Sequence, residues 1–473
     1  MTGQICFLLN DRQVCTPANS GLTVLDYLHH LARLRGTKVG CREGGCGACT
    51  LLVGSLRGEK VSYQSVASCL LPLGELQGKH LVTIEGLNQS RLSPVQQELV
   101  DRGATQCGFC TPGMVMSLTG YLLKAGTKIS FEELKNALGG NLCRCTGYAS
   151  IKRACNFLVT TTGNSSRENI QDLVAKAIVP EYFQEIPARL RQLSQSALEN
   201  GKTTADFLIA GGTEIYVNYG DILPESRVKL LNQSPQMKRI SSYEGKIYIK
   251  ALTTFAEFAT DPTIVKLIPD IQAYVSRIAS WQIRNRATLG GNIVAASPIA
   301  DGSILLLALD SLVMLNNGNR SRILTLKEFF QGYKQTAQKP GEILSEIIFP
   351  APQANKINFE KVSKRKYFDC AVVNSAIKIR CENDVICEIA ISMGGVAPIP
   401  LFLKQTSNYF IGKPVSQDTI ETAFPILQRE ISPISDVHGS AGYKRLLARQ
   451  LLIAHFSKLF PDFLQLRDFY TTN

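Results

Sequence analysis

Several common features of membrane and secreted proteins are missing from this sequence. No run approaches the ~18 consecutive apolar residues that a membrane-spanning helix needs, and the best candidate, residues 304–309, ends at Asp310. The first ten residues, MTGQICFLLN, lack both a basic segment and a small-residue cleavage site. The sequence therefore predicts a cytoplasmic protein with no membrane partner.

Common nucleotide and metal motifs are also missing. The chain has no G-x-G-x-x-G after a strand, no G-x-x-x-x-G-K-[ST], and five histidines without an H-E-x-x-H spacing. A Rossmann site, a P-loop and a histidine-based zinc site are therefore not expected. Charged residues make up only 19% of the chain, with a net charge of +12. Since only residues 364–366 form a dense basic run, a solvated surface or an acidic partner is favoured over nucleic acid.

Length and local signals indicate a globular chain of several domains. The 473 residues, 45% of them hydrophobic, suffice for three or four domains. Strands are expected at residues 5–9, 50–53 and 81–84, and a helix capped by Thr23 is expected to reach residue 34.

Helix-start signals at Ser93, Thr111 and Ser130, with a further helix over 148–158, predict a helical bundle in residues 91–159. The polar segment 160–169 is the best linker candidate. Farther on, a hairpin of strands 376–380 and 385–392 and an amphipathic helix over 443–459 are expected.

Cysteine is abundant and unevenly distributed. Eight of the 14 cysteines fall within residues 41–145, and the six others are Cys6, Cys15, Cys155, Cys370, Cys381 and Cys387. In a cytoplasmic chain, clustered cysteines are typical of metal ligands rather than of a disulfide framework. We expect the six scattered cysteines to be buried, small hydrophobic side chains.

The first cluster has the C-x4-C-x2-C…C spacing of plant-type ferredoxins, with Cys41, Cys46, Cys49 and Cys69 as its members. Four glycines, at positions 40, 44, 45 and 47, accompany these cysteines. Glycine allows a loop to turn its amide N–H groups toward an anionic cluster, often through positive φ. A zinc site would favour two C-x2-C knuckles and would not need the glycines. The pattern predicts a 2Fe–2S cluster.

The second cluster combines a C-x2-C pair, Cys107 and Cys110, with a C-x-C pair, Cys143 and Cys145. The spacing alone suits either zinc or a second iron–sulfur cluster. Each pair precedes an expected helix, so two helix N-termini with their partial positive charge would face one site. That placement favours an anionic iron–sulfur cluster.

The segments CGFCTPG and NLCRCTGY, following a ferredoxin-type loop, resemble the iron–sulfur module of the molybdenum hydroxylases. Xanthine dehydrogenase and aldehyde oxidase are members of this family. The resemblance covers residues 1–160 and implies two 2Fe–2S clusters. Their implied ligands are Cys41, Cys46, Cys49, Cys69, Cys107, Cys110, Cys143 and Cys145.

Two glycine loops follow, LIAGGTEI at 208–215 and ATLGGNI at 287–293, the latter leading into ASPIAD. Such turns can present backbone N–H groups to a diphosphate, although tight turns in a packed α/β domain look the same. Together the loops resemble the FAD domain of the molybdenum hydroxylases. Many relatives have Asn where this chain has Gly212. The implied FAD contacts are Leu208, Ile209, Ala210, Gly211, Gly212, Thr213, Glu214, Ile215, Thr288, Gly290, Gly291, Asn292, Ser297, Asp301, Leu344 and Lys361.

The resemblance implies a multidomain α+β chain. A plant-type ferredoxin-like β-grasp domain (1–86) and a four-helix 2Fe–2S domain (87–160) would precede a linker (161–178). An α+β FAD-binding domain of the vanillyl-alcohol-oxidase type (179–352) and a C-terminal α+β flavoprotein domain (353–473) would follow.

The resemblance also implies an oxidoreductase subunit that transfers electrons. It would take electrons from a molybdopterin site on a large partner subunit and pass them through two clusters to FAD and then NAD. Purines such as xanthine are the expected substrates, and a hydroxylase of aldehydes or N-heterocycles is the alternative. A heterodimer that assembles to a heterotetramer is expected. No catalytic side chain is expected in this chain, because the cofactors carry the chemistry.

Overall fold

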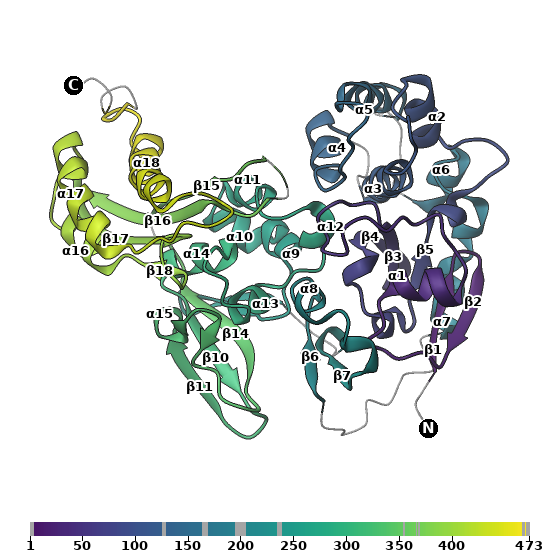
Figure 1. Cartoon of the computed structure of the whole chain (residues 1–473), viewed down its shortest axis with the longest axis horizontal. Helices are drawn as coiled ribbons and strands as arrows, with labels where there is room; N and C mark the ends of the chain where they lie inside the picture. The colour runs from purple at the N-terminus through teal and green to yellow at the C-terminus, as the bar shows by residue number, and fades with distance from the viewer. Residues whose placement is uncertain are drawn as a thin grey trace. The chain divides into compact units, whose positions relative to one another are not determined.

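The computed structural model describes residues 4–124, 129–162, 169–193, 205–233, 239–352, 355–365, 367, 369–465 and 469. The chain forms two compact units (Figure 1). The first contains Met1–Pro235 and Ala279–Ala287, and the second contains Gln236–Ile278 and Thr288–Asn473. The chain therefore leaves the second unit for a nine-residue segment and then returns to it.

A five-stranded sheet in the order β2-β1-β5-β3-β4 forms the N-terminal domain. Strand β1 runs parallel to β5 and antiparallel to β2. The expected ferredoxin-like fold is confirmed, although the sequence analysis did not anticipate β4. The strands are β1 (Ile5–Leu9), β2 (Arg12–Thr16), β3 (Thr50–Arg57), β4 (Lys60–Ala67) and β5 (His80–Val82).

The first helix is shorter than expected. Thr23 does cap α1 (Val24–Asp26), because its hydroxyl accepts a hydrogen bond from the Asp26 N–H at 3.1 Å. The chain continues as a π-helix, η1 (Tyr27–Leu31), and so stops short of residue 34. Arg33 has a φ of 58°, a left-handed conformation that a right-handed helix cannot continue through.

Four helices follow, as predicted: α2 (Pro94–Asp101), α3 (Thr111–Lys124), α4 (Phe131–Ala137) and α5 (Ala149–Thr162). Ser93 makes a full capping box with Gln96, and Ser130 accepts from the Glu133 N–H. The expected linker differs, because α5 reaches Thr162 and another helix, α6 (Ile170–Ala175), follows. Residues 163–168 of that linker lie outside the described residues.

The remainder of the first unit packs on the sheet. Helix α7 (Ile186–Leu193) buries Ile186 and Leu190 against Leu8 of β1. The parallel pair β6 (Phe207–Ile209) and β7 (Val228–Leu230), α8 (Ile215–Tyr219) and α12 (Trp281–Arg284) complete this unit. Residues 181–233, expected in an FAD domain, thus belong to the unit that holds the eight clustered cysteines.

His80 is fully buried in the first unit. Its Nδ1 lies 2.8 Å from the Tyr63 hydroxyl, and its Nε2 lies 2.9 Å from the Asn10 carbonyl oxygen. Burial lowers the pKa of His80 to about 3, so the imidazole is neutral in the folded protein.

The second unit contains two larger sheets. One has the order β11-β10-β14-β9-β8 and the other β15-β16-β17-β18. The strands of the first are β8 (Ile240–Tyr243), β9 (Lys246–Lys250), β10 (Leu312–Asn316), β11 (Ser321–Thr325) and β14 (Ile343–Pro350). Those of the second are β15 (Lys356–Val362), β16 (Val373–Glu382), β17 (Val385–Gly394) and β18 (Leu401–Phe402).

Helices cover both sheets. Helix α14 (Asp301–Ala308) is buried along its whole length and packs on β16 and β17. The predicted β16–β17 hairpin and C-terminal helix, α18 (Ala441–Leu459), are confirmed. The other helices include α9 (Phe255–Thr260), α10 (Pro262–Leu267), α11 (Ile271–Ser276), α13 (Leu289–Val294), α16 (Lys404–Phe410) and α17 (Gln417–Glu430).

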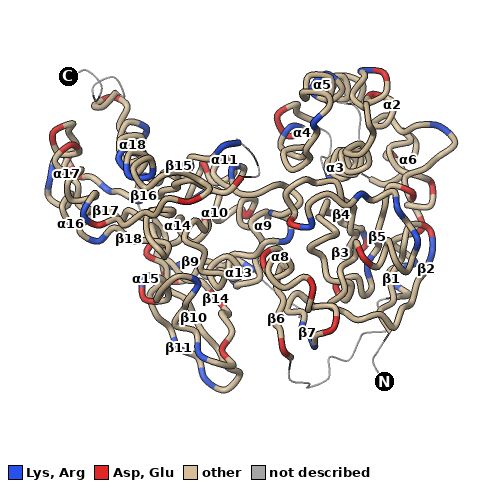
Figure 2. Tube along the Cα trace, viewed as in Figure 1, with Lys and Arg blue, Asp and Glu red and all other residues tan. Residues whose placement is uncertain are grey.

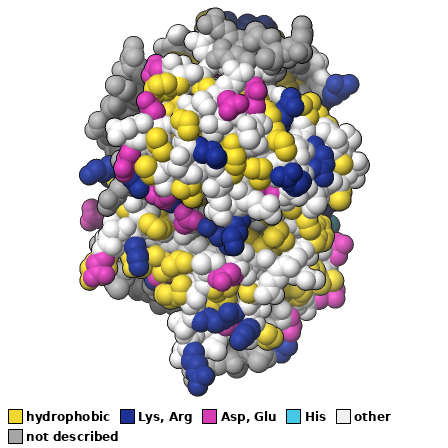
Figure 3. All heavy atoms as spheres, turned by 90° about the vertical axis from the view of Figure 1, so that its left-hand side faces the viewer, with side chains coloured by type: hydrophobic (Ala, Val, Ile, Leu, Met, Phe, Trp, Pro, Cys, Tyr) yellow, Lys and Arg dark blue, Asp and Glu magenta, His cyan; other side chains and the backbone are white. Residues whose placement is uncertain are grey.

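Charges are interspersed in both units. Figure 2 shows Lys and Arg distributed along the trace among Asp and Glu. On the face drawn in Figure 3, hydrophobic side chains form small groups separated by polar atoms. Within the dense basic run, Lys364 donates to the Val437 carbonyl at 3.2 Å, while Lys366 lies outside the described residues. Among the described residues, no helix has the length and apolar character needed to cross a membrane.

Candidate cofactor sites

The ferredoxin-domain site consists of Cys41, Cys46, Cys49 and Cys69. The first three lie in the loop before β3, and Cys69 follows β4 in a short 3-10 helix (Ser68–Leu70). The sulfurs of Cys49 and Cys69 lie 3.4 Å apart and are buried. The side chains of Cys41 and Cys46 hydrogen bond to each other. The four thiols therefore form two pairs.

The glycines of this loop have the geometry expected of them. Gly44 and Gly47 have φ values of 72° and 66°, which favour glycine. The N–H of Gly45 donates to the Cys41 sulfur at 3.2 Å. A Cβ on Gly40 would lie 2.6 Å from the Cys46 sulfur, so only glycine leaves room there. The loop thus turns backbone N–H groups toward sulfur.

Within each pair the two thiols hold protons unequally. The hydrogen bond with Cys46 lowers the pKa of Cys41 to about 5, and the same bond raises the pKa of Cys46. The bond between Cys49 and Cys69 likewise lowers the pKa of Cys49 and raises that of Cys69. Each pair therefore shares protons in a way that favours a thiolate, the form in which cysteine binds a metal.

The helical-domain site consists of Cys107, Cys110, Cys143 and Cys145. The sulfurs of Cys107 and Cys145 lie 3.6 Å apart, and both residues are exposed. Cys110 and Cys143 hydrogen bond to each other, and burial together with that bond raises the pKa of Cys110 to about 12. The site joins the residues just before α3 to those just before α5, as the helix placement predicted.

The pairing of the thiols separates the two metal interpretations. A structural zinc ion needs about four ligands around one point. A 2Fe–2S cluster instead takes four cysteines, two on each iron. Two pairs at each site therefore fit 2Fe–2S clusters.

Hydrogen bonds connect the two sites directly. The N–H of Leu142, adjacent to Cys143, donates to the Cys46 carbonyl at 2.9 Å. The amide of Asn141, which is 2% exposed, donates to the Gly47 carbonyl at 2.9 Å. Residues that flank proposed ligands of one site thus contact residues that flank ligands of the other. Asn141 begins the NLCRCTGY motif, but its contact with Gly47 could not be read from the sequence because the two residues are 94 positions apart.

The first glycine loop, residues 208–215, lies in the first unit between β6 and α8. Gly212 has a φ of 80°, and a Cβ there would lie 2.6 Å from the Leu70 carbonyl oxygen. Among the described residues, the N–H groups of Gly212 and Thr213 have no hydrogen-bond acceptor. Two free N–H groups at a glycine turn fit an anionic phosphate.

A buried ion cluster fixes this loop to the ferredoxin domain. Arg286 donates to the Gly211 carbonyl and to Glu75, with distances of 3.2 Å for both. Although burial alone would raise the pKa of Glu75, Arg286 and Lys79 hold it at about 2. The carboxylate is therefore charged, and Arg286 is a positioning residue for the loop. Sequence reasoning missed it, since Arg286 and Glu75 are 211 residues apart.

The second glycine loop, residues 287–293, lies in the second unit from Thr288 onward, as does the ASPIAD segment that follows it. The Thr288 hydroxyl caps α13 by accepting from the Gly291 N–H at 3.0 Å. A Cβ on Gly290 would meet Ala251 at 2.6 Å, whereas one on Gly291 would meet only the Thr288 hydroxyl. Gly290 is therefore needed for packing, and Gly291 leaves open space beside the helix start. The Asn292 side chain bonds to the Ser303 N–H at 3.0 Å.

The structure joins two of the other predicted flavin contacts. Lys361, with its side chain 2% exposed, pairs with Asp301 at 2.7 Å. Asp301 also accepts from Asn374 at 2.6 Å. Leu344 is buried in β14, and Ser297 lies in the turn before α14. The sixteen predicted FAD residues are thus divided between the two units.

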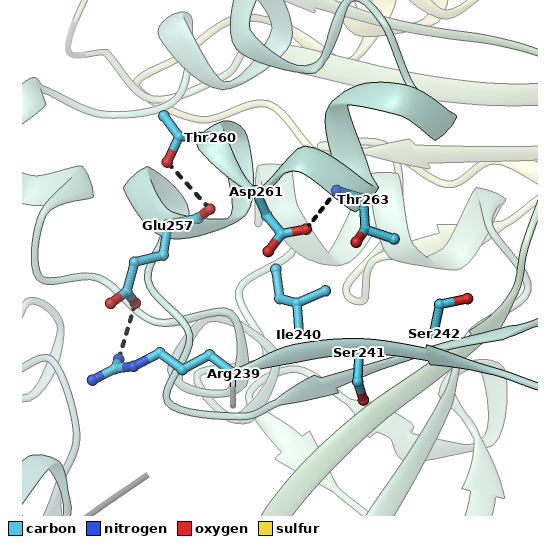
Figure 4. A pocket seen from close by; sticks show the side chains of 8 residues that line it. All are labelled: Arg239, Ile240, Ser241, Ser242, Glu257, Thr260, Asp261 and Thr263. Carbon is cyan, nitrogen blue, oxygen red and sulfur yellow. Dashed lines mark hydrogen bonds and ion pairs between the residues drawn. The ribbon is translucent and has the colours of Figure 1, made fainter. Parts of the chain in front are cut away.

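A pocket of about 570 Å³ lies elsewhere in the second unit, between β8 and the helices α9 and α10 (Figure 4). Its charged groups have local partners, since Arg239 pairs with Glu257 at 2.9 Å and Asp261 caps α10. None of the predicted flavin residues lines it. The lining residues are Arg239, Ile240, Ser241, Ser242, Glu257, Thr260, Asp261 and Thr263.

The prediction for the six scattered cysteines is wrong for all but Cys155, which is buried. Cys6 and Cys15 form a disulfide across paired positions of β1 and β2. Cys370 is exposed, and the two remaining residues, Cys381 and Cys387, are half-buried. The hairpin register explains the disulfide, because a two-residue turn after Leu9 places residues 6 and 15 opposite each other.

Four family models match the chain in order. They are a 2Fe-2S iron-sulfur cluster binding domain (7–73), a [2Fe-2S] binding domain (83–156), the FAD binding domain in molybdopterin dehydrogenase (181–352) and the CO dehydrogenase flavoprotein C-terminal domain (359–459). Together the four matches fit an iron–sulfur/FAD chain of the molybdenum hydroxylase type. Two 2Fe–2S-binding domains, an FAD-binding domain and a C-terminal flavoprotein domain thus make up the expected multidomain α+β architecture.

Individual relatives extend this match. Xanthine dehydrogenase 1 of Arabidopsis thaliana is 29% identical over 97% of this chain and 39% of its own length. Aldehyde oxidase 1 of Rattus norvegicus is 27% identical over 98% of this chain and 40% of its own length. The chain thus spans about two fifths of these curated relatives. The structure of quinoline 2-oxidoreductase from Pseudomonas putida 86 matches 54% of this chain and 88% of its own, with 25% identity and a TM-score of 0.50.

Proposed function

We propose that this chain is the electron-transfer subunit of a xanthine dehydrogenase. It carries electrons from a molybdopterin site on a large partner subunit through the helical-domain and ferredoxin-domain clusters to FAD and then NAD. The observation that carries the proposal is the direct hydrogen bond from Leu142 to the Cys46 carbonyl, at 2.9 Å. It joins the residues beside one cluster's ligands to those beside the other's.

The chemistry is divided between cofactors and chain. When bound, the 2Fe–2S clusters would accept and donate one electron at a time, and FAD would combine two electrons with a proton for exchange as a hydride. The chain's own residues bind and position these groups. In this proposal the thiols of Cys41, Cys46, Cys49 and Cys69 bind one cluster. Those of Cys107, Cys110, Cys143 and Cys145 bind the other, and the two glycine loops with Asp301, Leu344 and Lys361 contact FAD.

A second candidate is an iron–sulfur/FAD subunit of an aldehyde or N-heterocycle hydroxylase. The matches to aldehyde oxidase 1 and to quinoline 2-oxidoreductase support it. The two candidates share every residue described above, because the substrate pocket would lie on the partner. The substrate range of the complex distinguishes the two candidates, and it is measured as kcat/KM for xanthine, benzaldehyde and quinoline.

Two activities of one preparation test the proposal. The purified chain is expected to transfer electrons from NADH to a dye, because FAD and its nicotinamide-facing side belong to this chain. It is not expected to hydroxylate xanthine until a molybdopterin-containing partner is added. Xanthine turnover by the chain alone would contradict the subunit assignment. A chain with full FAD content that cannot oxidise NADH would contradict NAD as the acceptor.

The exposed residue Arg144, between Cys143 and Cys145, offers a test of where the partner binds. With Arg144→Glu, xanthine-dependent reduction in the complex should slow more than NADH-to-dye activity. Equal slowing of both activities would instead place the partner elsewhere. Arg153→Glu, a charge reversal at another exposed position of the same domain, is the matched control.

A further inference from the structure

The segment Ala279–Ala287 lies within the match to the FAD-binding domain, but it belongs to the first unit, which holds the eight proposed cluster ligands. Its helix α12 begins at Ser280, whose hydroxyl accepts from the Ile283 N–H. The Trp281 ring lies 6.5 Å from the ring of Tyr121 in α3. We call this stretch the inserted segment. Its polar side chains bond to the iron–sulfur domains.

Gln282, 2% exposed, occupies the centre of this contact. Its Nε2 donates to the Ser117 hydroxyl at 2.8 Å and to the Asn141 Oδ1 at 3.0 Å. It also lies 3.3 Å from the Ala137 carbonyl oxygen. One side chain thus binds α3, the end of α4 and the loop that leads to Cys143.

Backbone carbonyls fix the orientation of these amides. The Asn141 Nδ2 donates to the Gly47 carbonyl, which can only accept, so its Oδ1 is left as an acceptor. The Ser117 hydroxyl lies within 2.9 Å of the Gly113 carbonyl. Gln282 must therefore present its NH2 group to this network. The network runs without interruption from Gln282 through Asn141 to Gly47, which lies between Cys46 and Cys49.

The network has features that packing alone does not require. The Oε1 of Gln282 is buried and has no donor among the described residues. Leaving a buried amide oxygen unpaired is unfavourable, and an apolar side chain of similar length would avoid it. Gly140 leaves the space for this amide, since a Cβ there would lie 2.5 Å from Oε1. The hydrogen bonds that the Gln282 NH2 group donates therefore account for an amide side chain at this position.

We propose that Gln282 is a positioning residue for electron transfer between the two clusters. By holding the Asn141 side chain on the Gly47 carbonyl, it fixes the loop of the helical-domain site against the loop of the ferredoxin-domain site. The role of Gln282 in electron transfer rests on the proposed function, whereas its effect on the geometry of the two sites does not. The geometric claim requires only that both clusters are present.

The same helix provides a matched control. Arg284 is as buried as Gln282, with 4% exposure, and donates to the Asn136 side chain at 2.7 Å and the Ala279 carbonyl at 2.8 Å. Neither partner lies in a cysteine loop. A general role of the inserted segment in stability would therefore affect Gln282 and Arg284 variants alike, whereas positioning would affect only Gln282.

The experiment compares Gln282→Met and Arg284→Gln in the full chain with both clusters assembled. Iron and FAD contents are measured first, and then the magnetic interaction between the two reduced clusters by EPR. This interaction depends steeply on the separation and orientation of the clusters. In Gln282→Met we expect full iron and FAD, an altered interaction and intercluster transfer slowed about tenfold, since small misplacements of reacting groups have large rate effects. Arg284→Gln should match the wild type in both measurements.

A milder variant, Ser117→Ala, removes one acceptor and retains α3, because alanine favours helix. It should change the EPR interaction relative to the wild type, and this test remains valid if Gln282→Met loses a cluster and leaves no interaction to measure. An unchanged interaction in Gln282→Met or Ser117→Ala, or an equal change in Arg284→Gln, would overturn the proposal. Failure of xanthine or NADH activity would leave these EPR outcomes intact and would count only against the proposed function.

Discussion

The two cysteine sites have the same pairwise arrangement of thiols in opposite surroundings. In the ferredoxin-domain site, Cys49 and Cys69 are 3% and 4% exposed, and a glycine-rich loop supplies N–H donors to sulfur. In the helical-domain site, Cys107 and Cys145 are exposed, and two helix starts flank the thiols. The same donor set can therefore be built by a folded loop or by paired helix ends.

This difference in burial determines which molecules can reach each site. A buried site excludes solvent and small reagents, whereas an exposed one can approach another protein closely. The exposed edge at Cys107 and Cys145 suits the side on which electrons would enter from a partner.

The largest expected effect comes from removing one proposed ligand at each site. Cys145→Ser should remove one EPR signal and half of the four iron atoms, and leave the other signal unchanged, because the ligand sets are separate. Cys69→Ser should remove the other signal and also destabilise its domain, since a buried thiol becomes an unpaired hydroxyl. Iron analysis and EPR of both variants check this.

Loss of both signals from Cys145→Ser would contradict separate sites, as would stoichiometric zinc in the wild-type protein. Cys155→Ser is the control, because Cys155 is buried but outside both sites. It should retain both signals.

The difference in solvent access should make the two clusters bleach at rates that differ about tenfold or more. Under a reducing chelator, the helical-domain cluster should bleach first, because Cys107 and Cys145 are exposed. EPR of samples taken during chelation would follow each signal separately. Simultaneous loss of the two signals would show that the difference in burial does not control access.

Two glycines with positive φ separate backbone strain from steric overlap. Gly108→Ala in the helical-domain site should cost about 1 kcal/mol of unfolding free energy, because its φ is 80° but nothing lies within 4 Å of a Cβ. Gly47→Ala should cost about 1–3 kcal/mol more, because its Cβ would also lie 2.4 Å from the Gly140 carbonyl. Denaturant unfolding of both variants measures the difference, and equal costs would contradict the close approach.

The last effect is a pH dependence that the ferredoxin domain should show and the helical domain should not. His80 is neutral in the folded state, with its pKa lowered to about 3 by burial, whereas the unfolded chain binds a proton below about pH 6.5. The stabilisation is complete above pH 6.5 and is lost as the pH falls toward 3, by about 1.4 kcal/mol per pH unit.

His80→Gln should therefore reduce the acid sensitivity of the sheet. Residues 87–160 contain no histidine, so the helical domain is the internal reference. Hydrogen exchange of β1 and of α3, corrected for intrinsic rates, should separate between pH 7 and 5 in the wild type and converge in the variant. An unchanged pH profile of β1 in His80→Gln would contradict the assignment.

Local sequence signals predicted the features whose cause is local. The caps at Thr23, Ser93 and Ser130 form because each hydroxyl oxygen accepts from the backbone N–H three residues ahead. The spacing of the cysteines and their glycines identified the loop of the ferredoxin-domain site for the same reason. The Cys6–Cys15 disulfide could also have been predicted, because the register of a two-residue hairpin determines which residues face each other.

Features that depend on distant parts of the chain could not be predicted in this way. Gln282 and Asn141 are 141 residues apart, and no local pattern distinguishes Gln282 from a surface glutamine. The same holds for Arg286 and Glu75. The resemblance to a family predicts that the two glycine loops contact flavin, but it did not indicate that the first of them packs with the ferredoxin domain. Such partners are set by tertiary packing, which periodicity does not encode.

The inserted segment also constrains the order in which the chain folds. Strand β9 precedes the segment and pairs with β14, which follows it, so the second unit closes its sheet around a stretch that packs in the first unit. During synthesis, residues 1–235 are complete before Trp281 and Ile283 emerge, and their binding surface is then available. Residues 179–352 produced alone would leave these two apolar side chains without that surface. We therefore expect such a fragment to aggregate.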